Sequence, residues 1–342
     1  MQDKNAVGLS IGVYKNGQTH IYNYGESVKG SGKLIRSNQL FNMGSVAKTF
    51  VGTMLAEAVV EKKARLTDDI RLYLPGKYPN LQYRGHAIKL VDIANHTSGL
   101  PGSMREFTEK INDSLKHLSL PAQIQFFQKY NQDSMLRDLH YLKLDTIPGT
   151  RYHYNGNAMM ILTMLLERIY HQPYEVLVTH YLKTHLAMYN TRTRIPVAQF
   201  GQFIQGYNDN GEQVKWLAVN NAKQTDINTT MFYAGGPSMN STMNDMMKYL
   251  KAQIKATDPA IKLSHKLTFG ANPKDFAIGL NWMYDLEDGL KDYYHSGHTG
   301  IGFNTLCEFY PEKQLGFMIV VNDNISQDKV SKLENDLHKA IR

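Results

Sequence analysis

The sequence FNMGSVAKTF, residues 41–50, decides how the rest of the chain is interpreted. It places Ser45 and Lys48 three residues apart where a helix is predicted to begin, and residues at i and i+3 share one helix face. Apolar residues follow at helical spacing to about Lys62, namely Phe50, Val51, Met54, Leu55, Ala58 and Val59. A buried helix beginning here would bring the Ser45 hydroxyl and the Lys48 amine together.

This pair suggests nucleophilic catalysis. A serine hydroxyl is a poor nucleophile until a neighbouring base takes its proton, and lysine is a base only when neutral. Burial and the positive end of a helix dipole both disfavour the ammonium form of Lys48. The alternative is a surface serine beside a solvated lysine, because Ser-x-x-Lys also arises by chance. Other parts of the sequence must decide between the two.

Composition indicates a globular protein. The chain has 342 residues, of which 42% are hydrophobic and 20% charged, so it is long enough to bury a substantial core in one large domain or two smaller ones. No run of 18 apolar residues predicts a transmembrane segment, and residues 1–5 lack the features of a signal peptide. We therefore expect a mature or trimmed form with no signal or anchor in this chain.

The net charge of +7 comes from 38 basic and 31 acidic residues that are scattered along the chain. No basic stripe with interleaved aromatic residues predicts nucleic-acid binding, so we expect no nucleic-acid partner. The charge is consistent with a solvated surface that favours anionic partners such as anionic envelope polymers. Cys307 is the only cysteine, which excludes an internal disulfide and indicates a buried thiol.

Strands are predicted at both ends of the chain and helices between them. Residues 7–14 and 19–24 alternate as a hairpin around the turn at 15–17, and two more strands are predicted at 303–309 and 315–321. Helices are predicted at 158–169, 243–254 and 330–341, the second capped by a serine or threonine at 240–242. This order indicates one sheet that is assembled from the two termini and covered by helices.

Four further motifs follow the Ser45 helix. In chain order they are Asn95 to Pro101 (NHTSGLP), Pro148-Gly149-Thr150 leading to Tyr154, Ala234-Gly235-Gly236, and His295 to Gly300 (HSGHTG). Together with Ser-x-x-Lys, they resemble the serine β-lactamase and penicillin-binding-protein family over nearly the whole chain. The resemblance is to the branch that holds class C β-lactamases, D-alanyl-D-alanine carboxypeptidases and related esterases.

The resemblance implies an α/β (α+β) fold of the β-lactamase/transpeptidase type. One catalytic domain would span residues 1–342, with an α/β part at about 1–70 and 270–342 and a mainly helical part at about 71–269. An antiparallel sheet from both chain ends would be flanked by helices, and the active site would lie in the cleft between the two parts. No cofactor is implied.

The same resemblance assigns three catalytic roles. Ser45 would be the acylated nucleophile and Lys48 its base or proton relay. Tyr154 takes the place of a tyrosine that exchanges a proton with the leaving group or the deacylating water. Its alternative is a packing role as one of 21 tyrosines.

His298-Thr299-Gly300 lies where relatives carry Lys-Thr-Gly or His-x-Gly on a strand beside the cleft. A cation or donor there would hold a substrate carboxylate, and the N–H of Ile301, with that of Ser45, would form the oxyanion hole. His295-Ser296-Gly297 fits the same pattern three residues earlier. We prefer the later register because Gly302-Phe303 follows it, as a Gly-Phe pair does in the esterase relatives.

Two details limit these roles. His295 and His298 could instead bind a metal, but no third ligand at a recognisable spacing joins them, so we expect no metal site. Gly156 stands where most relatives have an asparagine that reaches the substrate amide, and Asn155 or Asn157 could supply that amide only from a shifted backbone. This departure argues against efficient β-lactam hydrolysis and leaves ester or peptide acyl transfer open.

The resemblance therefore implies a serine hydrolase that acts through an acyl-enzyme on D-alanyl peptides or esters of the bacterial cell envelope. The alternatives are a class C-like β-lactamase and, from another class, an inactive relative that binds wall fragments. The expected partner is a small-molecule or peptidoglycan-type substrate. The expected location is periplasmic or extracellular.

Overall fold

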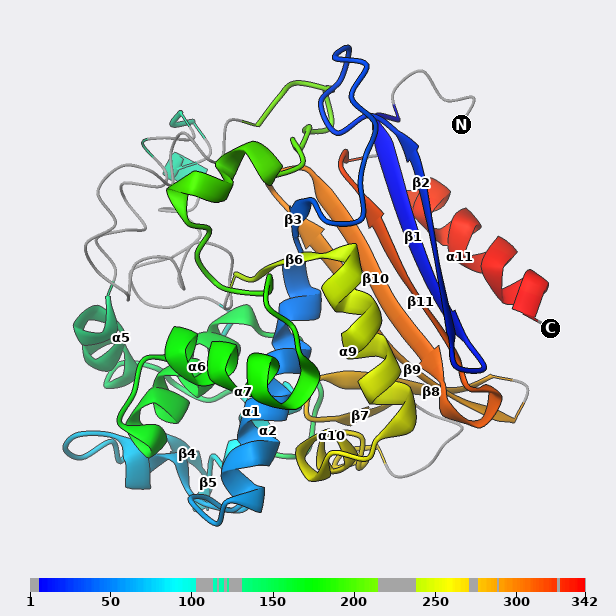
Figure 1. The fold of residues 1–342 in the computed structure, drawn as a ribbon. Coiled ribbons are helices and arrows are strands. Elements are labelled where there is room, and N and C mark those ends of the chain that lie inside the picture. The colour runs from blue at the N-terminus through cyan, green and yellow to red at the C-terminus, as the bar shows by residue number, and fades with distance from the viewer. Residues whose placement is uncertain are drawn as a thin grey trace.

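A seven-stranded antiparallel sheet built from both chain ends forms one side of the molecule (Figure 1). The computed structural model describes residues 6–102, 113–115, 117–119, 122, 131–214, 238–270, 276–287, 289–324 and 327–341. The strand order is β2-β1-β11-β10-β9-β8-β7. The strands are β1 (Gly8–Lys15), β2 (Gln18–Gly25), β7 (Ala277–Gly279), β8 (Trp282–Glu287), β9 (Leu290–Thr299), β10 (Phe303–Tyr310) and β11 (Leu315–Val321).

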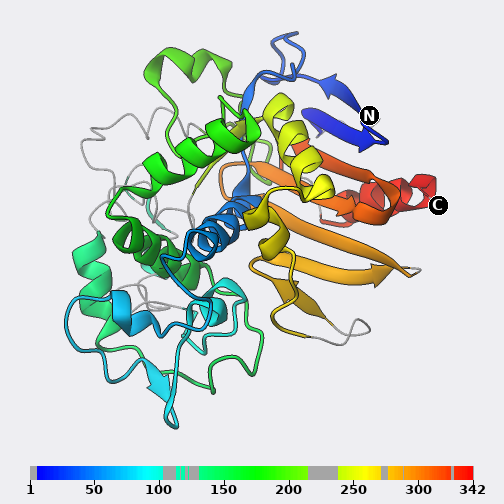
Figure 2. The same cartoon turned by 60° about the horizontal axis from the view of Figure 1, so that its bottom comes forward.

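The two chain ends meet where β1 pairs with β11, which places Leu9 opposite Val321. This confirms the predicted sheet from both termini. Every residue of β10 and β11 is buried, because helices cover both faces of the sheet at its centre. On one face, α11 (Gln327–Ile341) packs Leu333 and Leu337 against these strands. On the other face lies α9 (Met243–Lys255), which begins at the cap Thr242 (Figure 2).

Helix α1 (Ala47–Val60) runs through the middle of the molecule (Figure 1). Nearly all of its residues are buried, since it contacts α6 (Gly156–Tyr170), α7 (Tyr174–Leu186) and α10 (Pro259–Ser264), and the 3₁₀ turn at Gly44–Val46 that leads into it contacts β9 and β10. Its Phe50 ring stacks on Tyr249 of α9 with centroids 4.1 Å apart. Gly52 is required where the helix meets the turn before β8, because a Cβ there would lie 1.8 Å from the Leu280 carbonyl oxygen.

The remaining helices form the second part of the molecule around α6 (Gly156–Tyr170). Short strand pairs accompany them, β3 with β6 and β4 with β5. These elements are β3 (Leu40–Asn42), β4 (Gln82–Tyr83), β5 (His86–Ala87), α2 (Leu90–Ala94), α5 (Gln132–Leu139), α7 (Tyr174–Leu186), β6 (Asn240–Thr242) and α10 (Pro259–Ser264). α6 contacts both α1 and α2, so it fixes the loop before its own N-terminus against the start of the central helix.

Three details differ from the sequence prediction. Strands β7, β8 and β9 were not predicted from periodicity, because β9 carries histidine, serine and glycine residues in place of an alternating apolar pattern. Helix α9 packs on β1, β10 and β11, so the sheet-bearing part includes residues that the sequence assigned to the helical part at about 71–269. The predicted helix at 45–62 begins as a 3₁₀ turn at Gly44–Val46 and continues as α1.

Candidate active site

Ser45 and Lys48 are in direct contact at the start of α1. The Lys48 ammonium nitrogen Nζ lies 2.9 Å from the Ser45 hydroxyl oxygen Oγ, to which it donates a hydrogen bond. Lys48 is buried, with 4% of its surface exposed, whereas Ser45 is partly open to solvent. The 3₁₀ turn that leads into the helix sets this spacing. A buried amine beside an accessible hydroxyl is the arrangement that activates a serine.

The backbone before Ser45 is held by the sheet. Gly44 has φ +54°, and a Cβ there would lie 3.0 Å from the Thr299 methyl group and 3.2 Å from Gly297 of β9. The Thr305 hydroxyl of β10 donates to the Met43 carbonyl at 2.8 Å. A side chain at Gly44 would therefore push the helix start away from β9.

Tyr154 reaches the same place from the loop before α6. The Lys48 Nζ lies 5.2 Å from the centroid of the Tyr154 ring, which is 39% exposed. The structure thus brings together the three residues to which the sequence assigned catalytic roles, namely Ser45, Lys48 and Tyr154.

His96 is a residue whose contribution the sequence analysis missed. It has φ +57° in the turn after α2 and is 1% exposed, and its ring lies 4.5 Å from that of Tyr154. Its Nδ1 accepts a hydrogen bond from the Asn155 N–H at 3.1 Å, which fixes the Nε2-protonated tautomer of a neutral ring. The motif at Asn95 to Pro101 marked the turn, but nothing in it showed that this ring would support Tyr154.

His295 also lies near Tyr154, with ring centroids 6.4 Å apart. It is 1% exposed and its Nδ1–H donates to the Ser296 carbonyl at 2.7 Å. Burial, with the positive charge of Lys48, lowers the pKa of His295 to about 4. The same two causes, with His295 added, lower the pKa of His96 to about 3. Both imidazoles are neutral near pH 7, so His295, whose Nδ1–H already donates to the Ser296 carbonyl, brings no positive charge to the site.

The later motif, His298-Thr299-Gly300, lies at the end of β9, where the chain turns toward β10. His298 is exposed and its Nδ1–H donates to the Asn304 side-chain oxygen at 2.7 Å. The Thr299 hydroxyl accepts from the Phe303 N–H at 2.9 Å and so closes the turn. Gly300 is in that turn, and Ile301 is buried with its carbonyl against Gly206. These residues shape the turn between the two strands.

Gly297, rather than Gly300, lies against the nucleophile. A Cβ on Gly297 would be 2.9 Å from the Ser45 backbone nitrogen, 2.5 Å from the Met43 carbonyl oxygen and 2.4 Å from the Thr305 hydroxyl. A Cβ on Gly300 would meet nothing within 4 Å. The structure therefore brings the earlier motif, His295-Ser296-Gly297, to Ser45, in contrast to the register that the sequence favoured. Gly302 and Phe303, on which that preference rested, follow the turn and do not identify the strand residues at the site.

The amide N–H₂ groups of the two neighbouring asparagines both bond to the backbone of the loop after Ser98. Asn155 caps α6 by accepting from the Ala158 N–H, and its Nδ2 donates to the Leu100 and Pro101 carbonyls at 3.0 and 2.9 Å. Asn157 Nδ2 donates to the Gly102 carbonyl at 2.7 Å. Both Asn155 amide hydrogens are thus used within the protein, whereas the bond to Gly102 uses one of the two at Asn157, so of the two alternatives to the amide missing at Gly156 the structure argues against Asn155. The predicted motif Ala234-Gly235-Gly236 lies outside the described residues.

Comparison with known proteins supports the resemblance. A model of the family named Beta-lactamase matches residues 1–340. The chain belongs to the beta-lactamase family, a family of serine hydrolases.

Individual relatives of this family are distant. A beta-lactamase from Pseudomonas fluorescens is 24% identical over 362 residues, which covers 95% of this chain and 90% of the relative. The D-alanyl-D-alanine-carboxypeptidase/endopeptidase AmpH from Escherichia coli K12 is 23% identical over 332 residues, with 92% and 79% covered. A solved beta-lactamase/D-alanine carboxypeptidase from Yersinia pestis has a TM-score of 0.75 at 22% identity, covering 93% of this chain and 88% of that one. This likeness shows that the fold is that of the family.

Two further observations concern the residues that the structure describes in this beta-lactamase-family chain. Within the described ranges, no group of three or more histidine, cysteine, aspartate or glutamate side chains could hold a metal ion. None of the helices in the described part of the chain is long and apolar enough to cross a membrane. Ser45, Lys48 and Tyr154 are thus the reactive groups that the described site offers.

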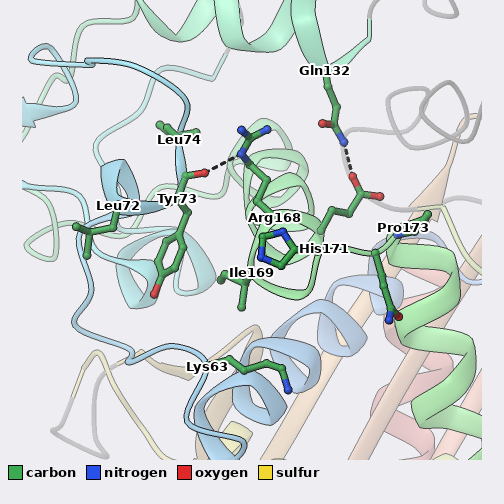
Figure 3. A pocket seen from close by; sticks show the side chains of 11 residues that line it. Lys63, Leu72, Tyr73, Leu74, Gln132, Arg168, Ile169, His171 and Pro173 are labelled. Carbon is green, nitrogen blue, oxygen red and sulfur yellow. Dashed lines mark hydrogen bonds between the residues drawn. The ribbon is translucent and has the colours of Figure 1, made fainter.

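A separate cavity of about 820 Å³ lies at the end of α6 (Figure 3), and its lining does not include Ser45, Lys48 or Tyr154. Its polar groups are largely paired with the protein. Arg168 Nε donates to the Tyr73 carbonyl at 2.8 Å, Lys63 pairs with Glu61 at 2.8 Å, and the Gln132 amide donates to the Glu167 carboxylate. The cavity contains no nucleophile with a base, so we do not place catalysis there.

We predict that acid destabilises the protein through its buried histidines. Burial lowers the folded-state pKa of His96, His265 and His295 to about 3, 3 and 4, against 6.5 for an exposed histidine. Below about pH 6.5 the unfolded chain binds these protons and the folded chain does not, so stability falls as the pH falls toward 4. The pKa of Asp92 is raised to about 6 in the folded protein, so protonation of Asp92 stabilises the fold as the pH falls. This gain offsets the loss of stability from roughly one histidine.

Urea unfolding at about pH 7 and pH 5 measures this loss, and His295→Gln should reduce the difference between the two midpoints. Equal midpoints for the unaltered chain at both pH values would contradict the assignment of neutral histidines.

Proposed function

We propose that this protein is a serine hydrolase that works through an acyl-enzyme. The observation that carries the proposal is the 2.9 Å contact between Lys48 Nζ and Ser45 Oγ, with Lys48 buried and its Nζ 5.2 Å from the Tyr154 ring centroid. In the reactive form the neutral Lys48 amine accepts the Ser45 proton while Oγ forms a bond to the substrate carbonyl carbon. The leaving group departs with a proton, which Tyr154 is placed to relay.

The oxyanion of the tetrahedral intermediate needs two fixed N–H donors. We assign these to the backbone N–H of Ser45 and that of His298, the residue after Gly297. The close approach of Gly297 to the Ser45 nitrogen supports this register, because it leaves no side chain between β9 and the nucleophile. This proposal replaces Ile301, which is buried beyond the turn, as the second donor.

Deacylation reverses the same proton transfers. A water molecule attacks the acyl carbonyl carbon, Tyr154 and Lys48 take its proton, and Ser45 Oγ leaves with a proton returned by the same pair. The neutral rings of His96 and His295 contact the Tyr154 ring beside Lys48 without adding a second positive charge.

The substrates we propose are D-alanyl peptides or esters of the bacterial cell envelope. The relatives include a protein named as a D-alanyl-D-alanine carboxypeptidase/endopeptidase, which supports this class. The neutral His295 and the glycine at position 156 favour substrates whose recognition needs neither a cation at His295 nor a side-chain amide contact at position 156. We further propose one catalytic domain over residues 1–342, located in the periplasm or outside the cell, with attraction to anionic polymers through the charge of +7.

A class C-like β-lactamase is the second candidate, since several relatives carry that name. A binding-only relative that holds wall fragments is the third. Retention of a nucleophile, a base and a tyrosine in contact argues against it, because binding alone does not require these three groups together.

We predict that Ser45→Ala abolishes ester hydrolysis and covalent labelling by a fluorophosphonate, because no other group forms the acyl bond. Intact-protein mass after incubation with the reagent measures labelling, and circular dichroism verifies the fold. Ser31→Ala, at an exposed serine in a loop, is the control that should label normally. Labelling of a folded Ser45→Ala protein would show that another residue is the nucleophile.

We predict opposite results for two glycines of the HSGHTG segment. Gly297→Ala places a methyl group within 3 Å of the Ser45 nitrogen, so it should lower kcat/KM for an ester roughly 100-fold or more, the scale of a lost oxyanion donor. Gly300→Ala meets no atom within 4 Å and should leave the rate nearly unchanged. If Gly300→Ala lost activity and Gly297→Ala did not, the later motif, His298-Thr299-Gly300, would be the one that lies at the nucleophile.

We predict that small activated esters are hydrolysed faster than β-lactams, and that Gly156→Asn raises the turnover of penicillin relative to ester. A missing hydrogen bond to the side-chain amide of a β-lactam costs about 0.5 to 1.5 kcal/mol. The ratio of the two kcat/KM values measures the effect, and Gly201→Asn is a control at an open position. A kcat/KM for a cephalosporin of about 10⁶ M⁻¹s⁻¹ or more in the unaltered enzyme would favour the β-lactamase reading.

A further inference from the structure

Strand β2 is an edge of the seven-stranded sheet and is open to solvent (Figure 2). It pairs with β1 on one side, and no strand of the described residues pairs with its other side. Six of its eight residues are exposed, including Tyr22 at 48% and Tyr24 at 50%. An edge strand of this length presents a row of unpaired backbone donors and acceptors.

The hairpin turn shows which backbone groups face outward. Asn16 and Gly17 have φ +50° and +90°, the type I′ pattern of a two-residue turn, which makes Lys15 and Gln18 a hydrogen-bonded pair. Hydrogen-bonded and non-hydrogen-bonded pairs alternate along an antiparallel ladder. Counting from Gln18, the N–H and C=O groups that point away from β1 belong to Thr19, Ile21, Asn23 and Gly25.

This edge lacks the usual protection against pairing. Its sequence, QTHIYNYG, contains no lysine, arginine, aspartate, glutamate or proline, although the chain as a whole carries a charge of +7. Natural edge strands avoid association through charges, proline or bulges. Because the strand is uncharged, two copies of it can meet without bringing like charges together.

We propose that two copies of this protein associate by antiparallel pairing of their β2 strands about a two-fold axis at Ile21. Ile21 then lies opposite Ile21 of the second copy, and Thr19 lies opposite Asn23. All of these residues turn their N–H and C=O groups outward, so each opposed pair exchanges two N–H···O bonds. The result is one continuous sheet shared by the two chains.

The side chains fit this register. On the face of Ile21 the central contact is apolar, and on the opposite face His20 of each copy lies beside Tyr22 of the other, an aromatic cross-strand pair. The new ladder ends at Asn23, because the Gly25 carbonyl already accepts a hydrogen bond from the Ile35 N–H of its own chain and the Glu26 carboxylate accepts from the Gly30 and Gly32 N–H groups. The bonds between the two copies therefore come from Thr19, Ile21 and Asn23.

The pairing leaves both active sites open. In the strand order, β1, β11 and β10 separate β2 from β9, which carries His295 and Gly297. The activity and the association can therefore be measured independently.

A disulfide test examines the register directly. Opposed residues of a hydrogen-bonded antiparallel pair have Cα atoms about 5.5 Å apart, within the range that a disulfide spans. Ile21→Cys should form a covalent dimer with an added oxidant such as diamide, while Thr19→Cys, which faces Asn23, should form little. The native Cys307 is buried and does not compete. Equal cross-linking of the two variants, or of neither, would overturn the proposed register.

Light scattering during size-exclusion chromatography measures the association itself. The unaltered chain should run at twice its mass of 39.0 kDa at high concentration. Thr19→Pro removes an outward N–H that the β1 ladder does not use, so it should give a monomer with unchanged ester hydrolysis. A monomeric unaltered chain at every concentration at which it is soluble, or a Thr19→Pro variant that still dimerises, would refute the proposal.

Discussion

The close approach of β9 to the first turn of α1 is the constraint on which the site depends. Gly297 on the strand and Gly44 before the helix lack side chains where each backbone faces the other, and the Thr305 hydroxyl holds the Met43 carbonyl. Only at this spacing do the Ser45 hydroxyl and a backbone N–H of β9 lie close enough to contact the same carbonyl group of a bound molecule. The helix must also be buried, since burial keeps the Lys48 amine at Ser45 rather than in water.

The groups around Tyr154 follow from the same packing. Its ring lies near two imidazoles that burial keeps uncharged, so Lys48 is the cation in contact with that ring in the described part of the site. His295 is also neutral, and its Nδ1–H is already paired with the Ser296 carbonyl.

Much of this could be predicted from the sequence, for physical reasons that differ by residue. The period of the apolar residues after Ser45 predicted a buried helix, and the fixed i to i+3 spacing then placed Lys48 beside the hydroxyl. The hairpin at the N-terminus was predictable because Asn16-Gly17 suits a tight turn. The register of the histidine motif was not, because both candidates have the same composition and only the position of the β9 to β10 turn separates them. His96 was missed because its role depends on a ring contact with Tyr154, 58 positions later in the chain.

The pairing of β1 with β11 has a consequence for how the chain folds. Leu9 can meet Val321 only after nearly the whole polypeptide has been made. The edge of β1 that pairs with β11 therefore stays unpaired during most of synthesis. Contacts between such distant parts of a chain raise the contact order, and high contact order slows folding. The reactive serine is assembled late for the same reason, since β9 and β10 complete its surroundings. Nascent chains would therefore remain inactive until the last strands join the sheet.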